Sequence, residues 1–102
     1  MSQDHDALLS KLFALVRRLY ADTEGMRDNP AEQQLWYDRG YANGMVQALR
    51  ELGYGERLES QLQPDPEDLI AGQEALAWGK AYQHGLEVGS RETHEVVSRT
   101  QE

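Results

Sequence analysis

Apolar residues recur every three or four positions in the first part of the chain, the spacing that places side chains on one face of a helix. They are Leu8, Leu9, Leu12, Phe13, Leu15, Val16, Leu19 and Tyr20. Asp4 and Asp6 precede this run, where the start of a helix favours side-chain acceptors and negative charge. A polar segment around Gly25 follows it. The pattern predicts an amphipathic first helix over about residues 4–22 that packs on a core.

The segment from Asn29 to Glu32 is typical of a helix start. Asn29 can act as the cap, and Pro30 suits the first turn, where its missing amide hydrogen is not needed. We expect a second helix over about residues 30–52, with Gly53 as its C-terminal cap. This helix carries two apolar faces, and a helix that is apolar on two sides usually lies between neighbours. We therefore expect it to be the central element.

The segment 53–65 is predicted to be a connector. Residues 51–74 hold seven acids and a single base, Arg57. A charged connector in contact with water explains this composition. An acidic docking surface is the alternative.

Asp65 and Pro66 again have the pattern of a capped helix start, and acids follow in what would be the first turn. We expect a third helix over about residues 66–96. The tail, residues 97–102, is expected to fray because its end lacks apolar anchors.

One pattern occurs twice in the chain: YDRGYANGMVQALRE at residues 37–51 returns as WGKAYQHGLEVGSRE at residues 78–92. Each copy holds an aromatic residue, a tyrosine, a glycine and a small residue at spacings of four, three and four, which form one stripe on a helix. The members are Tyr37, Tyr41, Gly44 and Ala48 in the first copy and Trp78, Tyr82, Gly85 and Gly89 in the second. Glycine inside a helix costs about 1 kcal/mol relative to alanine. The stripe therefore predicts close contact with another backbone.

Three interpretations of the repeated stripe are open. The second and third helices can form an antiparallel hairpin in which the glycines meet. Alternatively, one stripe can serve a second copy of the chain in a two-fold homodimer. In the third interpretation, aromatic side chains line a pocket for a flat or cationic ligand. These aromatic residues are Trp36, Tyr37, Trp78 and Tyr82.

The fold class predicted from these elements is all-α, with one domain over residues 1–102. We expect an antiparallel arrangement of three helices in which the second is central. Two copies of this arrangement are expected to pair in a symmetric homodimer. The formal net charge is -8, of which residues 1–50 contribute -1 (seven acids, six bases) and residues 51–102 contribute -7 (eleven acids, four bases). This acidity disfavours nucleic acid as a partner, because phosphate contact needs clustered Lys and Arg.

The sequence offers little catalytic chemistry. Cysteine is absent, which excludes disulfides and thiolate metal sites. His84 and Glu87 share a helix face, but a metal site usually needs three or four ligands, so we expect neither metal nor cofactor. The serines lie in no recognisable nucleophile motif, and we expect no enzyme. No apolar run approaches the roughly 18 residues of a membrane span, and no signal peptide is evident, so we expect a cytoplasmic protein.

The size, charge, helix plan and the segment WYDRGYANGMVQALRELGY resemble the small bacterial quorum-sensing antiactivators of the QslA type. The resemblance implies an all-helical homodimer that binds the ligand-binding domain of a LuxR-type transcription factor. Such binding would cover the dimerisation surface of that factor and so prevent it from binding DNA. The mechanism is stoichiometric and requires no catalysis.

We therefore expect a regulatory protein that acts by protein contact through an apolar surface on the first or second helix. The candidate residues are Leu12, Leu19, Leu35, Met45, Leu49 and Leu52. One alternative is a small structural, adaptor or chaperone-like protein whose partner is itself or a secretion substrate. Another is a small-ligand binder that uses the Trp and Tyr cluster.

Overall fold

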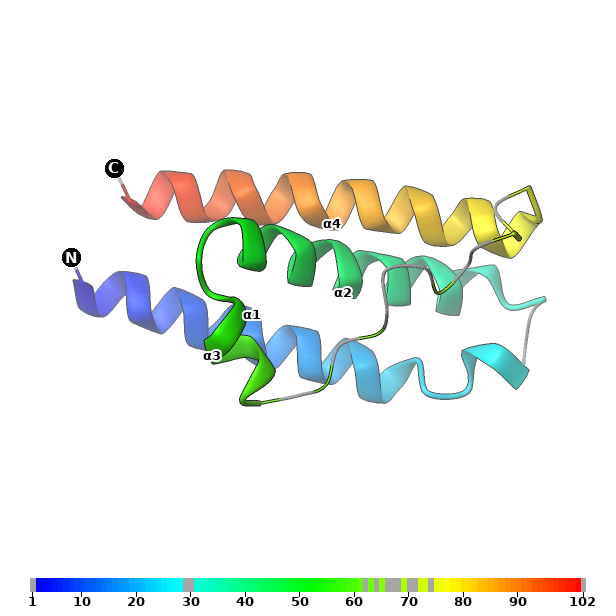
Figure 1. The fold of residues 1–102 in the computed structure, drawn as a ribbon, viewed down its shortest axis with the longest axis horizontal. Coiled ribbons are helices and arrows are strands. Elements are labelled where there is room, and N and C mark those ends of the chain that lie inside the picture. Colours follow the sequence, from blue (N-terminus) through cyan, green and yellow to red (C-terminus); the bar gives the residue numbers. More distant parts are fainter. Residues whose placement is uncertain are drawn as a thin grey trace.

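The chain folds into helices joined by irregular segments (Figure 1). The structure is a computed structural model that describes residues 2–28, 31–61, 63, 65, 69, 72–73 and 75–101, with the side chains of 2–5, 27, 100 and 101 excepted. Its elements are α1 (Ser2–Asp22), the 3-10 helix η1 (Met26–Asp28), α2 (Gln33–Glu51), α3 (Gly55–Glu59) and α4 (Ala77–Gln101). The described residues contain no strand, which confirms the all-α prediction. None of the helices in this part of the chain is both long and apolar enough to cross a membrane.

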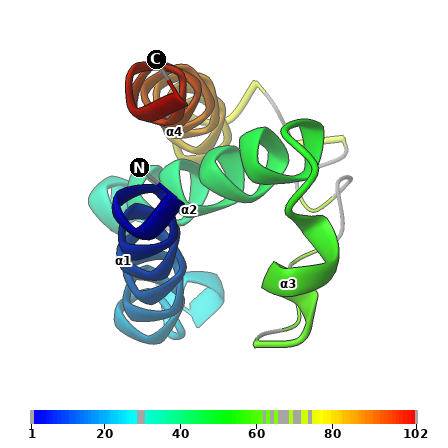
Figure 2. The same ribbon diagram turned by 90° about the vertical axis from the view of Figure 1, so that its left-hand side faces the viewer.

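The central helix is α2, which contacts α1, α3 and α4. Viewed end-on, α4 lies on one side of α2, and α1 and α3 lie on the other (Figure 2). The main core fills the space between α1, α2 and α3. Its buried members are Leu9, Phe13, Val16, Met45, Val46, Leu49 and Leu58. The short α3, which the sequence analysis did not separate from the connector, contributes Leu58 to this core.

Gly53 closes the C-terminus of α2 as predicted, two residues after the last helical residue, Glu51. Gly53 adopts a left-handed conformation, with φ of 98°. Its amide donates to the carbonyl of Arg50 at 3.1 Å, and the amide of Tyr54 donates to the carbonyl of Leu49 at 2.8 Å. This pair of bonds is the Schellman motif, which satisfies the last carbonyls of a helix. The predicted cap at 29–30 lies outside the described residues, and α2 begins at Gln33.

The predicted antiparallel packing of the second and third long helices is wrong, because α2 and α4 run parallel. In Figure 1 both begin at the same end of the molecule, whereas α1 runs in the opposite direction. The contacts agree: Gly40 faces the carbonyl of Tyr82, and Gly44 faces that of Leu86, so the residue numbers rise together. Parallel neighbours require a connection that returns along their length. The segment after α3 makes this return. The homodimer stays a prediction.

The last helix also begins later and ends later than predicted. α4 spans Ala77–Gln101, while the sequence pattern predicted 66–96. Pro66 lies outside the described residues, and Gly72 has φ of 83°, which no α-helix contains. The tail is held because the side chain of Val97 is fully buried (0% exposed). An apolar anchor in the last turns therefore keeps α4 helical to Gln101.

Four glycines bring the backbones of α2 and α4 into direct contact. Gly85 and Gly89 of α4 face the carbonyls of Tyr37 and Tyr41, as Gly40 and Gly44 of α2 face those of α4. A β-carbon built at any of these four positions would overlap backbone atoms of the opposite helix. Small residues at such positions let two helices approach closely. We call this contact the glycine seam.

A substitution in the glycine seam tests the contact. In Gly44→Ala, the added β-carbon would lie only 2.7 Å from the amide nitrogen of Ser90, and backbone atoms cannot rotate away. We expect a loss of about 1–3 kcal/mol in the free energy of unfolding, as is typical of overpacking. Chemical denaturation measures this loss.

Gly55→Ala is the matched control. There, the nearest atom to an added β-carbon belongs to the flexible side chain of Arg50, at 3.2 Å. We expect a change of no more than about 1 kcal/mol. If Gly44→Ala is as stable as the unsubstituted protein, α2 and α4 are not in backbone contact.

Candidate functional site

The most elaborate polar arrangement in the described structure surrounds Asp65, a residue of the connector. Arg39 of α2 binds its carboxylate with two hydrogen bonds, from Nε to Oδ2 at 2.6 Å and from Nη2 to Oδ1 at 3.1 Å. Both side chains are largely buried, at 12% and 14% exposed. Two-pronged Arg–carboxylate pairs combine charge with fixed geometry. The pair therefore fastens the connector to the central helix.

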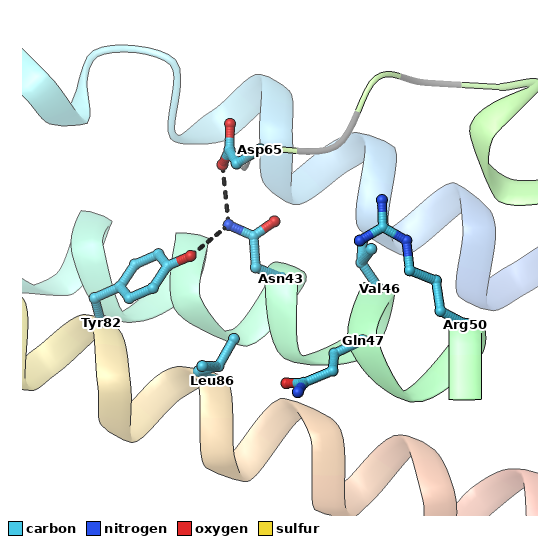
Figure 3. Close-up of a pocket in the computed structure, with 7 residues that line it drawn as sticks. All are labelled: Asn43, Val46, Gln47, Arg50, Asp65, Tyr82 and Leu86. Atoms are coloured by element: carbon cyan, nitrogen blue, oxygen red, sulfur yellow. Dashed lines mark hydrogen bonds between the residues drawn. The ribbon is translucent and has the colours of Figure 1, made fainter. Parts of the chain in front are cut away.

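Asn43 links this ion pair to the other long helices (Figure 3). Its Nδ2 donates to Asp65 Oδ2 and to the hydroxyl oxygen of Tyr82, each at 2.9 Å. Its Oδ1 accepts a hydrogen bond from the hydroxyl of Tyr20. The same hydroxyl oxygen accepts the backbone amide of Asp65 at 2.9 Å. Residues from α1, α2, the connector and α4 thus meet at one buried amide. We call these five residues, Tyr20, Arg39, Asn43, Asp65 and Tyr82, the Asp65 latch.

Arg39 also completes the contact with the end of α1. Its Nη1 donates to the carbonyl of Tyr20 and to Oγ1 of Thr23, both at 3.0 Å. The guanidinium carbon lies 3.8 Å from the centre of the Tyr20 ring, in a cation–π arrangement. Burial opposes the charge of Arg39, but its hydrogen bonds to Asp65 and the negative charge of Asp65 outweigh this and raise the pKa of Arg39. Arg39 therefore stays charged beside Asp65.

Three tyrosines, Tyr20, Tyr41 and Tyr82, are held in their neutral form. Burial raises the pKa of Tyr20 to about 12, and burial also raises the pKa of Tyr82. Tyr41 lies outside the latch and donates to the carboxylate of Glu92 at 3.0 Å. Burial, followed by that carboxylate, raises the pKa of Tyr41 to about 12. These neutral phenols hold segments of the chain together through their hydrogen bonds.

The predicted seam residues lie between α2 and α4. Six of the eight take part in the backbone contact: Tyr37, Tyr41, Gly44, Tyr82, Gly85 and Gly89. Ala48 is fully buried, and Trp78 stacks on Trp36. The pattern did not single out Gly40, which the repeat aligns with Ala81. Its spacing of four residues before Gly44 was the signal that could have identified it.

Of the aromatic residues proposed as a pocket, Trp36 and Trp78 pack against each other, whereas Tyr82 lines a cavity beside Asp65 and Tyr37 lines a separate open groove. The ring centres of Trp36 and Trp78 are 4.2 Å apart, and those of Trp36 and Tyr82 are 6.5 Å apart. Trp36 and Tyr82 are each 4% exposed and form a second core cluster with Met26. Among the described side chains, the indole nitrogen of Trp36 is buried without a hydrogen-bond partner. Direct contact between the two indoles leaves no slot for a ligand between them.

The predicted partner surface is partly wrong. Met45 and Leu49 are 1% and 0% exposed, because they pack against α1 in the main core. Leu12, Leu19, Leu35 and Leu52 are partly exposed, and the first two lie at the edge of the main core. A partner surface that includes these four leucines stays a prediction.

The described residues contain no group of three or more His, Asp or Glu side chains placed to hold a metal ion. His84, considered above with Glu87, instead packs its ring edge-on to Tyr37 at 5.5 Å between centres. Beside the latch lies a cavity of about 130 Å³ between α2, α4 and Asp65 (Figure 3). The sequence pattern predicts a helix cap at Asp65, and nothing in that pattern links this residue to Arg39 or Asn43.

Breaking the latch should cost far more than breaking an exposed ion pair. Asp65→Asn removes the charge that balances buried Arg39, and we expect a loss of about 3 kcal/mol in the free energy of unfolding. Glu59→Gln is the matched control, because Glu59 is half exposed and binds Arg50 at 3.2 Å. Glu59→Gln should lower the free energy of unfolding by less than about 1 kcal/mol. Equal losses in a denaturation experiment would contradict a buried latch.

Stability should fall at alkaline pH. The ordinary pKa of tyrosine is 10.0, and the folded values of Tyr20 and Tyr41 are about 12. A raised folded pKa means that the stabilisation is fully present below pH 10 and is lost as pH rises through about 12. Melting temperatures measured across this window should drop. The Tyr41→Phe variant lacks the ionisable hydroxyl, so its melting temperature should fall less between neutral and alkaline pH than that of the unsubstituted protein. An equal fall in both proteins would contradict the burial of Tyr41.

Comparison with known proteins assigns this chain to no family. No protein-family model, no curated protein and no solved structure matches it. The function must therefore be argued from the residues and the geometry described above.

Proposed function

We propose that this protein is a regulatory protein that acts by binding another protein through α1. The observation that carries the proposal is a row of four leucines along this helix, which we call the leucine stripe. Its members are Leu8, Leu12, Leu15 and Leu19. Their spacing of four, three and four is that of a coiled-coil seam. Leu15 is 38% exposed, and the other three are partly exposed.

The leucine stripe lies at the edge of the main core, which Leu12 and Leu19 contact, and does not supply its fully buried side chains. That role belongs to the neighbouring stripe of Leu9, Phe13 and Val16, each at most 1% exposed. On the opposite flank of the buried stripe, Asp6 approaches Arg57 of α3 at 4.0 Å. At 100° per residue, the leucine stripe therefore faces away from α3. Leu15 is the most exposed member of the leucine stripe.

Charge around the leucine stripe favours an unlike partner. Lys11 and Arg18 are exposed and hold the positions that flank a coiled-coil seam. If two copies paired through this stripe in antiparallel orientation, these bases would face each other. An amphipathic helix of another protein, with acidic residues beside its apolar face, would complement them.

The resemblance to antiactivators of the QslA type suggests the class of partner. We propose the ligand-binding domain of a LuxR-type transcription factor, whose dimerisation a bound α1 would obstruct. This role needs surface complementarity and no reaction. It agrees with a molecule whose polar residues are engaged in holding its own segments together.

The test is co-purification of the tagged protein at moderate salt, followed by mass spectrometry and light scattering. We expect a transcription factor in a defined complex in which it is no longer dimeric. Leu15→Asp should weaken this complex at least about tenfold, because charge is introduced into an apolar contact.

Leu76→Asp is the matched control, because Leu76 is 48% exposed and lies immediately before α4. It should leave the complex intact. If both aspartate variants bind equally well, the leucine stripe is not the binding surface. Recovery of the protein alone as a homodimer would instead favour the structural or adaptor alternative.

A further inference from the structure

The cavity beside the Asp65 latch has polar groups at both ends and an apolar middle (Figure 3). Asn43 and Tyr82 form one end, and Arg50 forms the other. Val46 is the apolar residue that α2 contributes between them. Asn43 and Tyr82 are 8% and 4% exposed. One end is thus a rigid, buried wall of polar side chains.

At the buried end, the group available to a ligand is a hydrogen-bond donor. Both Nδ2 hydrogens of Asn43 are used, on Asp65 and Tyr82, and its Oδ1 accepts from Tyr20. Within the described part of the chain, the one hydrogen bond of the Tyr82 hydroxyl is the bond that it accepts from Asn43. The hydroxyl hydrogen of Tyr82 is therefore left to donate into the cavity.

At the open end, the available groups are donors with positive charge. Arg50 donates through Nη2 to Glu59 at 3.2 Å, and both side chains are partly exposed, at 34% and 54%. Such a pair is worth little in water, and the other N–H groups of Arg50 remain available. The exposed side chain of Gln47 also lines the cavity, but its amide points toward α4, away from the guanidinium of Arg50 (Figure 3).

The negative charge of Asp65 does not decide which ligand charge the cavity favours. Its carboxylate lines the wall, but it is paired with Arg39 through two hydrogen bonds. The polar groups of the lining that remain available to a ligand are therefore hydrogen-bond donors. Between them, Val46 and Leu86 supply an apolar wall that suits methylene groups.

We propose that this cavity binds a short aliphatic carboxylate that carries a second acceptor, such as a 4-oxo or 4-hydroxy acid. The carboxylate would contact Arg50 at the open end. The oxo or hydroxyl oxygen would accept the hydrogen of Tyr82 at the buried end. The volume of about 130 Å³ compares with the roughly 150 Å³ cavity that holds benzene, and the open end accommodates the carboxylate.

The test uses three molecules of similar length and the full-length, isotope-labelled protein. The ligand 4-oxopentanoate has both acceptors, pentanoate lacks the oxo group, and 2-pentanone lacks the carboxylate. We expect saturable NMR shifts at Val46, Gln47 and Leu86, with the tightest binding for 4-oxopentanoate. Loss of a hydrogen bond or charge contact should weaken binding about tenfold. Shifts that do not saturate, or equal binding of the three molecules, would overturn the proposal.

Two variants separate the ends of the site. Tyr82→Phe should reduce the affinity for 4-oxopentanoate to that for pentanoate while leaving pentanoate unchanged. Arg50→Gln should weaken both carboxylates and spare 2-pentanone; it lies near the surface and keeps the test valid if Tyr82→Phe fails to fold. Lys80→Gln is the control, because Lys80 lines a separate open groove with His84. Binding that is lost in Lys80→Gln and kept in Arg50→Gln would overturn the assignment.

Discussion

The fold depends on the direct contact between the backbones of α2 and α4. In most helix pairs side chains keep the axes 8–10 Å apart, but here four glycines remove the side chains where the helices touch. Gly40 and Gly44 meet carbonyls of α4, and Gly85 and Gly89 meet carbonyls of α2. Each helix thus presents both a gap and the backbone that enters the gap of its partner. This reciprocity gives the sequence repeat a physical reason, since two helices that solve one packing problem need the same small residues.

The parallel direction of α2 and α4 determines what the connector must do. The chain leaves α2 at one end of the molecule and has to enter α4 at the other (Figure 1). A long return segment costs conformational entropy, and the Asp65 latch offsets part of this cost. Arg39 and Asn43 hold the carboxylate, while the hydroxyl of Tyr20 accepts the amide of the same residue. The cavity lies between α2, α4 and Asp65. It is therefore also a consequence of the parallel direction of α2 and α4, which brings the connector to this place.

The surface of α1 and the cavity are separate features. The leucine stripe is outside the latch, on the side of α1 away from α3, and its chemistry suits an apolar helix with acidic flanks. The cavity belongs to α2, α4 and the connector, and its donors suit a small acceptor-bearing ligand. Of the residues that line the cavity, only Val46 also belongs to the main core on which α1 packs. A ligand would therefore contact α2, α4 and the connector, whereas a protein partner would contact α1.

The sequence by itself determined the helical class, the extent of α1, the end of α2 at Gly53 and the stripe on which α2 and α4 meet. Each of these follows from local periodicity or from the conformational freedom of glycine. Only the tertiary structure decided that α2 and α4 are parallel, because a stripe of small residues packs in either direction. It also decided that Met45 and Leu49 pack on α1, and that the side chain of Asp65 binds Arg39 and Asn43. These contacts join residues far apart in the chain, and a charged pair leaves no periodic signal from which burial can be inferred.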